Sequence, residues 1–262
     1  MMNDALLLED LPSEPVAAKV VEVIEKAFKR HADGEDYLAG MRMAVPGVGE
    51  LYGVKVPVLR KMADVVIRAY KNDGDALRTI ALDSWGRGSR EHQLLALFML
   101  VKIKLEPAER WELGVRFLPD VDNWESCDQL CAALLGEALA KDPGYMDVIE
   151  GWVEDENLWV RRAALVAPVY LRRAKHTEQV SLDLDRRTLA LCRSLLDDGE
   201  KYIRKAVDWS IRQAIRRNYD LGREWMLAQA AAKHSRIGRA TLKLAAKKLT
   251  ETDRKAFLAL LV

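Results

Sequence analysis

Two six-residue stretches of the 262-residue chain are similar to each other: WVRRAA at residues 159–164 and YIRKAV at residues 202–207. Their offset of 43 residues falls in the range of HEAT repeats, each of which is a pair of helices. In this register, successive repeats present equivalent positions at Gln93, Asp128, Arg162 and Lys205. We therefore predict an all-α fold, a HEAT-like α-solenoid of antiparallel helix pairs with a concave groove that can hold an extended partner.

The rest of the sequence agrees with a chain of helices. From Val16 onward, apolar residues recur at spacings of three and four, and no stretch alternates with a period of two. The breaks are short and contain residues that stop or start helices, as in DPG at residues 142–144 and DDG at residues 197–199. Residues 1–15 lack this periodicity and contain two prolines. We predict a flexible tail over residues 1–15 and a single repeat domain over residues 16–262.

Composition limits the class of protein. Half of the residues are hydrophobic and 31% are charged, which is typical of a globular protein. No apolar run approaches the roughly 18 residues of a membrane helix, and the first residues lack the features of a signal peptide. Cys127, Cys131 and Cys192 form no regular disulfide framework. We expect reduced thiols and a cytoplasmic, nucleoid-associated protein.

The net charge of +1 conceals an uneven distribution. Residues 1–158 contain 18 Lys and Arg against 29 Asp and Glu, whereas residues 159–262 contain 23 against 11. This asymmetry points to a polyanionic partner for the C-terminal part, which would make the groove basic. The alternative is that the charges only solvate the surface of a helical repeat protein.

A basic stripe with an embedded tryptophan follows one face of the helix expected at residues 201–217. Its members are separated by four, three and four residues: Lys205, Trp209, Arg212 and Arg216. An exposed tryptophan leaves a large apolar surface in water unless a partner covers it. The alternative is that Trp209 turns into the core.

A second candidate region is DNWESCD at residues 122–128. Asn123 or Asp122 can cap a helix on which Trp124 and Asp128 share one face. Asp128 lies in an otherwise apolar helix, so its carboxylate needs water or a cation. Either Asp128 serves the function, or it forms a structural ion pair with Arg162 of the next repeat.

Two adjacent arginines mark a third region. Arg162 lies on the predicted concave side and can hold a phosphate through two hydrogen bonds, whereas Arg161 points about 100° away and is expected to be solvated. The sequence has no Walker loop, no dinucleotide-binding motif, and no clustered cysteines or histidines. We therefore expect no metal, no nucleotide and no other cofactor.

From about Tyr37 to its C-terminus, the chain resembles the AlkD-like DNA alkylation repair proteins, HEAT-like DNA glycosylases that act on alkylated purines. The resemblance rests on four segments: LYGVKVPVLR at 51–60, NWESCD at 123–128, NLWVRRAA at 157–164 and KAVDW at 205–209. It implies that Asp128, Trp124 and Trp209 are catalytic. Asn123, Glu125 and Asp208 depart from the family's commonest pattern, and the added acid at Asp208 is expected either to weaken phosphate attraction or to alter lesion preference.

The resemblance implies that Arg162 helps to hold the DNA backbone, and the other basic residues of this region would supply salt-dependent phosphate contacts. The expected DNA-binding residues are Arg162, Lys205, Arg212, Arg216, Trp159, Arg236, Arg239 and Lys243. The expected activity is hydrolysis of the N-glycosidic bond of cationic N3- and N7-alkylated purines, such as 3-methyladenine and 7-methylguanine. A monomer would act on double-stranded DNA in base excision repair without flipping the base. The alternatives are a non-catalytic nucleic-acid-binding scaffold and a sensor of damaged DNA.

Overall fold

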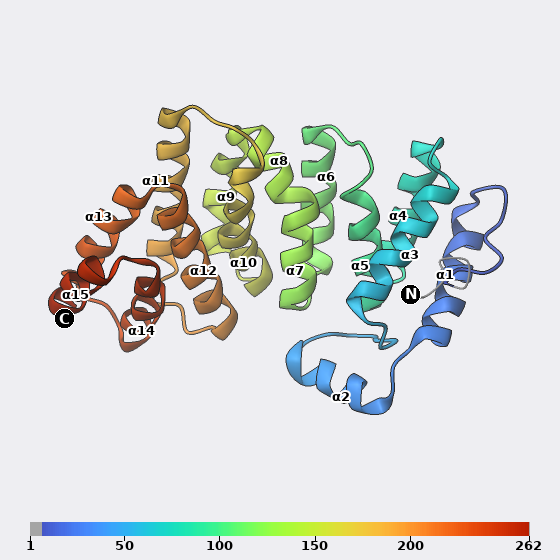
Figure 1. The fold of residues 1–262 in the computed structure, drawn as a ribbon, viewed down its shortest axis with the longest axis horizontal. Helices are drawn as coiled ribbons and strands as arrows, with labels where there is room; N and C mark the ends of the chain where they lie inside the picture. The colour runs from blue at the N-terminus through green and yellow to red at the C-terminus, as the bar shows by residue number, and fades with distance from the viewer. Residues whose placement is uncertain (1–6, 262) are drawn as a thin grey trace. The chain divides into compact units, whose positions relative to one another are not determined.

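The computed structural model describes residues 7–261, and within this range it contains helices and no β-strand (Figure 1). The predicted all-α, solenoid-like fold is thereby confirmed. The chain divides after Leu134 into two compact units, unit 1 and unit 2. The assignment of residues 16–262 to a single domain stays a prediction. None of the described helices is both long enough and apolar enough to cross a membrane.

Unit 1 is organised around one fully buried helix. Its α-helices are α1 (Ala17–His31), α2 (Glu35–Ala44), α3 (Val56–Ala69), α4 (Gly74–Gly86), α5 (Arg90–Leu100), α6 (Pro107–Phe117) and α7 (Trp124–Leu130). Helix α5 packs against α3, α4 and α7, and every one of its residues is buried. Because α5 has no solvent-facing side, its polar N-terminal residues also lie in the interior. Helix α2 has no buried residue and stands apart on extended connections (Figure 1).

The beginning of unit 1 is held by packing and by a hydrogen bond. Leu7 and Leu8 are buried, and the Tyr70 hydroxyl donates to the Pro12 carbonyl at 2.7 Å. This part of the predicted tail therefore packs against the unit, which differs from the loose attachment expected from its sequence. Residues 1–6 of the predicted tail lie outside the described residues.

Unit 2 contains the longest helices of the described chain. Its α-helices are α8 (Gly136–Lys141), α9 (Met146–Gly151), α10 (Leu158–Val166), α11 (Glu178–Ser194), α12 (Lys201–Arg217), α13 (Tyr219–Ala230), α14 (Arg236–Ala245) and α15 (Glu251–Leu260). Short 3-10 segments include η6 (Ala167–Arg173) and η7 (Ala246–Lys248). Helix α12 contacts α10, α11, α13 and α14, so it is the central helix of this unit.

Local sequence explains where the helices of unit 2 begin and how closely they pack. The side chains of Asn157, Thr177 and Ser235 cap α10, α11 and α14 by accepting backbone N–H groups. Gly222 lets α13 approach α12, since a Cβ atom there would lie 2.7 Å from the Ile215 backbone. The two similar stretches at 159–164 and 202–207 both lie at the start of a helix, as the repeat register predicts.

Candidate functional site

Helix α7 of unit 1 carries Trp124 and Asp128 on its first two turns. Asn123 caps this helix, because its side chain accepts the Ser126 N–H at 2.9 Å. The Trp124 indole is half-buried, and its Nε1–H donates to the Ala44 carbonyl at 2.9 Å, at the end of α2. Asp128 is also half-buried and follows four residues later on the same side of the helix. The predicted cap and the Trp124 and Asp128 pair are both present as expected.

Two functional candidates in unit 1 escaped the sequence analysis. Arg90 and Glu91 are buried at the start of α5, and the Arg90 guanidinium makes two hydrogen bonds to Glu125, the neighbour of Trp124. A signal existed in the sequence REHQLLALFML, in which a charged pair precedes an apolar helix without a polar face. Periodicity could not identify it, because a helix buried on all sides shows no amphipathic pattern.

The two arginines of α10 are both held by other parts of unit 2. Arg162 is only 4% exposed, and its Nη1 donates to the Tyr202 carbonyl at 2.5 Å, which joins α10 to the start of α12. The expectation that Arg161 is solvated is wrong. Its side chain is 17% exposed, forms an ion pair with Asp198 at 3.3 Å, and donates to the carbonyls of Asp155 and Glu156. Arg161 thereby closes the turn that precedes α10.

Aromatic rings and cations gather where α10 and α12 begin. The Trp159 and Tyr202 rings lie 5.5 Å apart between centroids, and both residues are half-buried. The ammonium groups of Lys201 and Lys205 lie 5.7 and 5.6 Å from the centre of the Tyr202 ring. Cations over a partly exposed aromatic ring form a surface that suits both phosphates and planar rings.

Further along α12, Trp209 lies between the two alternatives left open by its sequence. It is half-buried, and its ring meets Tyr170 edge-on with centroids 6.4 Å apart. Part of the indole is packed and part is available to a partner. Trp209 belongs to unit 2, whereas Trp124 and Asp128 belong to unit 1. Their assembly into one site stays a prediction.

The two arginines of the α12 stripe differ in whether they form an ion pair. Arg212 forms a two-pronged ion pair with Asp208, with distances of 3.0 and 2.8 Å. Asp208 is therefore placed to offset the charge of Arg212. Arg216 is exposed and has no ion-pair partner among the residues that the structure describes.

Two adjoining grooves between α12 and the α14–η7 segment are lined by basic side chains. One, of about 370 Å³, is lined by Lys201, Arg204, Lys205, Asp208, Thr241 and Leu244. The other, of about 360 Å³, is lined by Asp208, Arg212, Leu244, Lys247 and Lys248. Lys201 and Arg204 are absent from the predicted DNA-binding set, which took its α12 members from the four-three-four stripe alone.

The remaining predicted residues lie on α14, outside the linings of these grooves. Arg236 and Lys243 are exposed. Arg239 is half-buried, and its Nη1 donates to the His234 carbonyl at 3.3 Å. Asp197 accepts hydrogen bonds from the N–H and hydroxyl of Ser235, which fixes the start of this helix.

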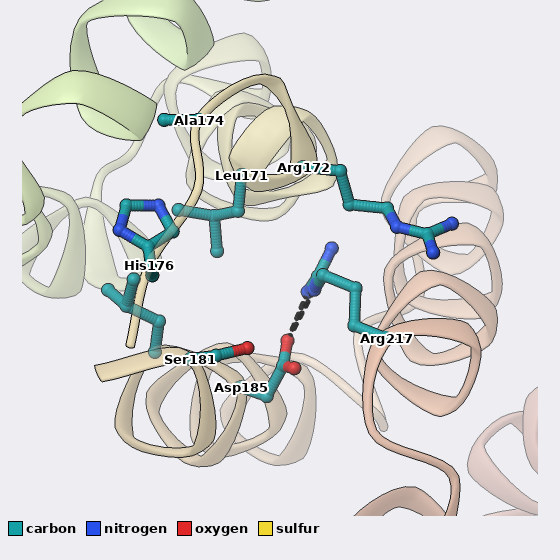
Figure 2. A pocket seen from close by; sticks show the side chains of 8 residues that line it. Leu171, Arg172, Ala174, His176, Ser181, Asp185 and Arg217 are labelled. Atoms are coloured by element: carbon teal, nitrogen blue, oxygen red, sulfur yellow. Dashed lines mark hydrogen bonds and ion pairs between the residues drawn. The ribbon is translucent and has the colours of Figure 1, made fainter. Parts of the chain in front are cut away.

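A separate pocket of about 210 Å³ lies between η6, α11 and the end of α12. Figure 2 shows Arg217 reaching across it toward Asp185. The Arg217 Nε donates to Asp185 at 2.6 Å, and its Nη1 donates to the Pro168 carbonyl at 3.1 Å. Both charges are at least nine-tenths buried. The pair joins α11 to the C-terminal end of α12, the helix that bears Trp209.

Comparison with known proteins identifies relatives of this chain. Residues 24–249 match the family model described as DNA alkylation repair enzyme. The solved structure of a predicted DNA alkylation repair enzyme from Enterococcus faecalis matches with a TM-score of 0.65 and 19% sequence identity. The match covers 84% of this chain and 98% of that protein. At this identity the likeness shows the fold alone. No curated protein sequence matches the chain.

Proposed function

The chain belongs to the family of DNA alkylation repair enzymes, and from that premise we propose that it is a DNA glycosylase. Its substrates would be cationic N3- and N7-alkylated purines, including 3-methyladenine and 7-methylguanine, in double-stranded DNA. The observation that carries this proposal is the half-buried pair of Trp124 and Asp128, one turn apart on one side of the capped helix α7. An indole and a carboxylate on one partly exposed helix face are suited to a cationic sugar.

The chemistry requires little from the protein. An N3- or N7-alkylated purine already carries a positive charge, so it leaves the sugar without a general acid. The remaining tasks are to stabilise the oxocarbenium-like sugar and to direct a water molecule to it. Asp128 supplies the negative charge and orients the water, as carboxylates do in glycosidases. The ring faces of Trp124 and Trp209 would add about 1 to 2 kcal/mol each where they are desolvated.

DNA affinity in this proposal comes from unit 2. Lys205, Lys247 and Lys248 are exposed around the grooves beside α12 and can contact phosphates in a salt-dependent way. The residues assigned to catalysis lie on the faces of protein helices rather than inside a pocket. The damaged base would therefore stay stacked in the DNA duplex. This arrangement favours charged lesions over neutral ones, since the leaving base itself provides the activation.

The decisive experiment is single-turnover release of 7-methylguanine from a defined duplex, with DNA binding measured in parallel. For Asp128→Asn we expect a decrease of roughly a hundredfold or more in the rate, with affinity retained. The matched control is Asp75→Asn, which makes the same change at an exposed position of α4 and should leave the rate unchanged.

Two outcomes would contradict the proposal. If the wild-type protein releases no base although it binds DNA tightly and in a salt-sensitive way, it is a scaffold or a damage sensor. If it releases neutral 1,N6-ethenoadenine as fast as 7-methylguanine, activation by the charged base is wrong.

A further inference from the structure

One buried guanidinium in unit 1 joins three segments that are distant in sequence. The Arg90 side chain is 1% exposed, and its Nε and Nη2 donate to the two oxygens of Glu125 at 2.6 and 3.0 Å. Its Nη1 donates to Glu91 at 3.0 Å and to the Val54 carbonyl at 3.2 Å. Arg90 thus connects the start of α5, the loop before α3 and the first turn of α7.

Glu91 holds the loop side of this network. Its carboxylate is fully buried and accepts the backbone N–H groups of Tyr52, Gly53 and Val54 at 2.9, 3.0 and 3.2 Å. Three successive N–H groups can converge on one carboxylate because Gly53 adopts a φ of +86°. A side chain at Gly53 would also meet Leu38, since a Cβ atom there would lie 2.7 Å from Leu38 Cδ2.

The α7 side of the network fixes the residue that carries the indole. Glu125 follows Trp124 directly, and the next residue, Ser126, donates its hydroxyl to Gln93 of α5 at 3.2 Å. The first turn of α7 is therefore bonded to α5 at two successive residues. The Trp124 Nε1–H is bonded separately to the Ala44 carbonyl of α2. Together these contacts define both the position of the turn and the plane of the indole.

The charges in this network indicate a geometric role. Burial by itself lowers the pKa of the Arg90 guanidinium, but hydrogen bonds and charge from Glu125 and Glu91 raise it above its usual value. Arg90 therefore stays charged between the two carboxylates. A buried ion pair is seldom more stable than well-packed apolar side chains of the same volume, whereas it fixes orientation closely. Both carboxylates lie in the first turn of a helix, where the helix dipole favours negative charge.

We propose that Arg90 is a positioning residue for catalysis. Through its two-pronged contact with Glu125, it holds the first turn of α7, and with it Trp124 and Asp128, in register with the loop at residues 52–54. Loss of this contact lowers the rate of bond cleavage much more than DNA affinity. The proposal rests on the proposed function, because the residues that it places are those assigned to catalysis.

The test uses Arg90→Lys in the full chain. Lysine keeps the charge but cannot bond both oxygens of Glu125 and the Val54 carbonyl at once. We expect the single-turnover rate at saturating DNA to fall tenfold or more, while the dissociation constant changes less than threefold. Amide hydrogen exchange should increase in residues 51–55 and 124–130. Glu125→Gln is the milder second variant, to be used where Arg90→Lys does not fold.

The matched control is Arg110→Lys. Arg110 is another buried arginine of unit 1, and it donates to the carbonyls of Leu100, Ile103 and Ala133 rather than to the first turn of α7. Its substitution should lower the melting temperature as Arg90→Lys does, without the loss of rate in the protein that remains folded.

Each outcome separates this inference from the proposed function. If the wild type is active and folded Arg90→Lys keeps the wild-type rate, the positioning role is wrong and the proposed function stands. If the wild type releases no base, the proposed function fails, and hydrogen exchange still decides whether Arg90 holds α7. Unchanged exchange at residues 124–130 in Arg90→Lys would then overturn the inference as well.

Discussion

Up to Leu134 the chain contains 17 Lys and Arg against 22 Asp and Glu, whereas from Leu135 onward it contains 24 against 18. The charges that the proposals assign to catalysis and to DNA binding are also placed differently in the two units. In unit 1, the buried Arg90 guanidinium is bonded to the buried Glu91 and to the half-buried Glu125. In unit 2, the lysines beside α12 are exposed around shallow grooves. Buried, paired charges can hold a reactive group in place, and exposed, unpaired charges attract a polyanion without fixing its position.

The strongest test of this difference removes exposed lysines from one unit at a time. In unit 2, the variant Lys205→Gln, Lys247→Gln and Lys248→Gln should weaken binding of undamaged duplex DNA. Each lost phosphate contact costs roughly 1 kcal/mol, so we expect roughly a hundredfold loss at moderate salt. The slope of log affinity against log salt should fall by about 3. Fluorescence anisotropy over a range of salt concentrations measures both quantities.

The matched control makes the same change of charge in unit 1. Lys61, Lys71 and Lys104 are exposed, and none of them has an ion-pair partner within residues 7–261. Their replacement by glutamine should change DNA affinity by less than threefold. Equal losses from the two triple variants would show that affinity follows total charge, and the comparison between the units would then be wrong.

Unit 1 should also be the more sensitive of the two to mild acid. His92 is buried between the Phe28 and Tyr52 rings, and burial lowers its pKa to about 4. Between this value and the unfolded pKa near 6.5, the unfolded chain binds a proton that the folded chain excludes. The folded state is therefore stabilised by the neutral His92 fully above about pH 6.5, and this contribution is lost as the pH falls toward 4. We expect a loss of about 2 to 3 kcal/mol in the free energy of unfolding.

Urea unfolding at pH 7 and at pH 4.5 measures this effect, with hydrogen exchange locating it in unit 1. His92→Gln should remove most of the pH dependence in this interval. The same substitution at His31, which is half-buried at the end of α1, should leave it in place. If the free energy of unfolding of His92→Gln still falls between pH 7 and pH 4.5, groups other than His92 cause the pH dependence.

The sequence predicts best those features that depend on neighbouring residues. The helix at 201–217, the cap at Asn123 and the shared face of Trp124 and Asp128 all follow from local spacing, and all are present. Arg161 was misjudged because its ion-pair partner, Asp198, lies 37 residues away. Position on a helix face says nothing about which loop of the next helix pair approaches that face.

The buried charges of α5 were missed for a related reason. Arg90 and Glu91 find their partners in the loop before α3 and in α7 at sequence separations of 35 to 39 residues. The sequence does not show that these segments approach one another in space, and a charged pair at the start of a helix usually faces water. The resemblance to a known family includes the segment at residues 51–60, but the contact that holds its loop part, residues 52–54, was visible only in the structure.

The smallest expected effect concerns the one arginine of the α12 stripe that carries its own counterion. Asp208→Asn removes the partner of Arg212 and leaves it available to a phosphate. We expect DNA to bind two- to fivefold more tightly, with the salt slope increased by up to about 1. Asp220→Asn makes the same change at an exposed position of α13 and should have a smaller effect.

Comparison of two arginines in the wild-type background decides how the Asp208 result is interpreted. If Asp208 neutralises Arg212, then Arg212→Gln lowers DNA affinity less than Arg216→Gln does. In the Asp208→Asn background, this difference between the two arginine variants should reverse or disappear. If Arg212→Gln is already the more costly change, the ion pair opens when DNA binds and Asp208 does not weaken the surface. In that case Asp208 holds Arg212 in position before DNA arrives, and this part of unit 2 follows the principle of paired charges seen in unit 1.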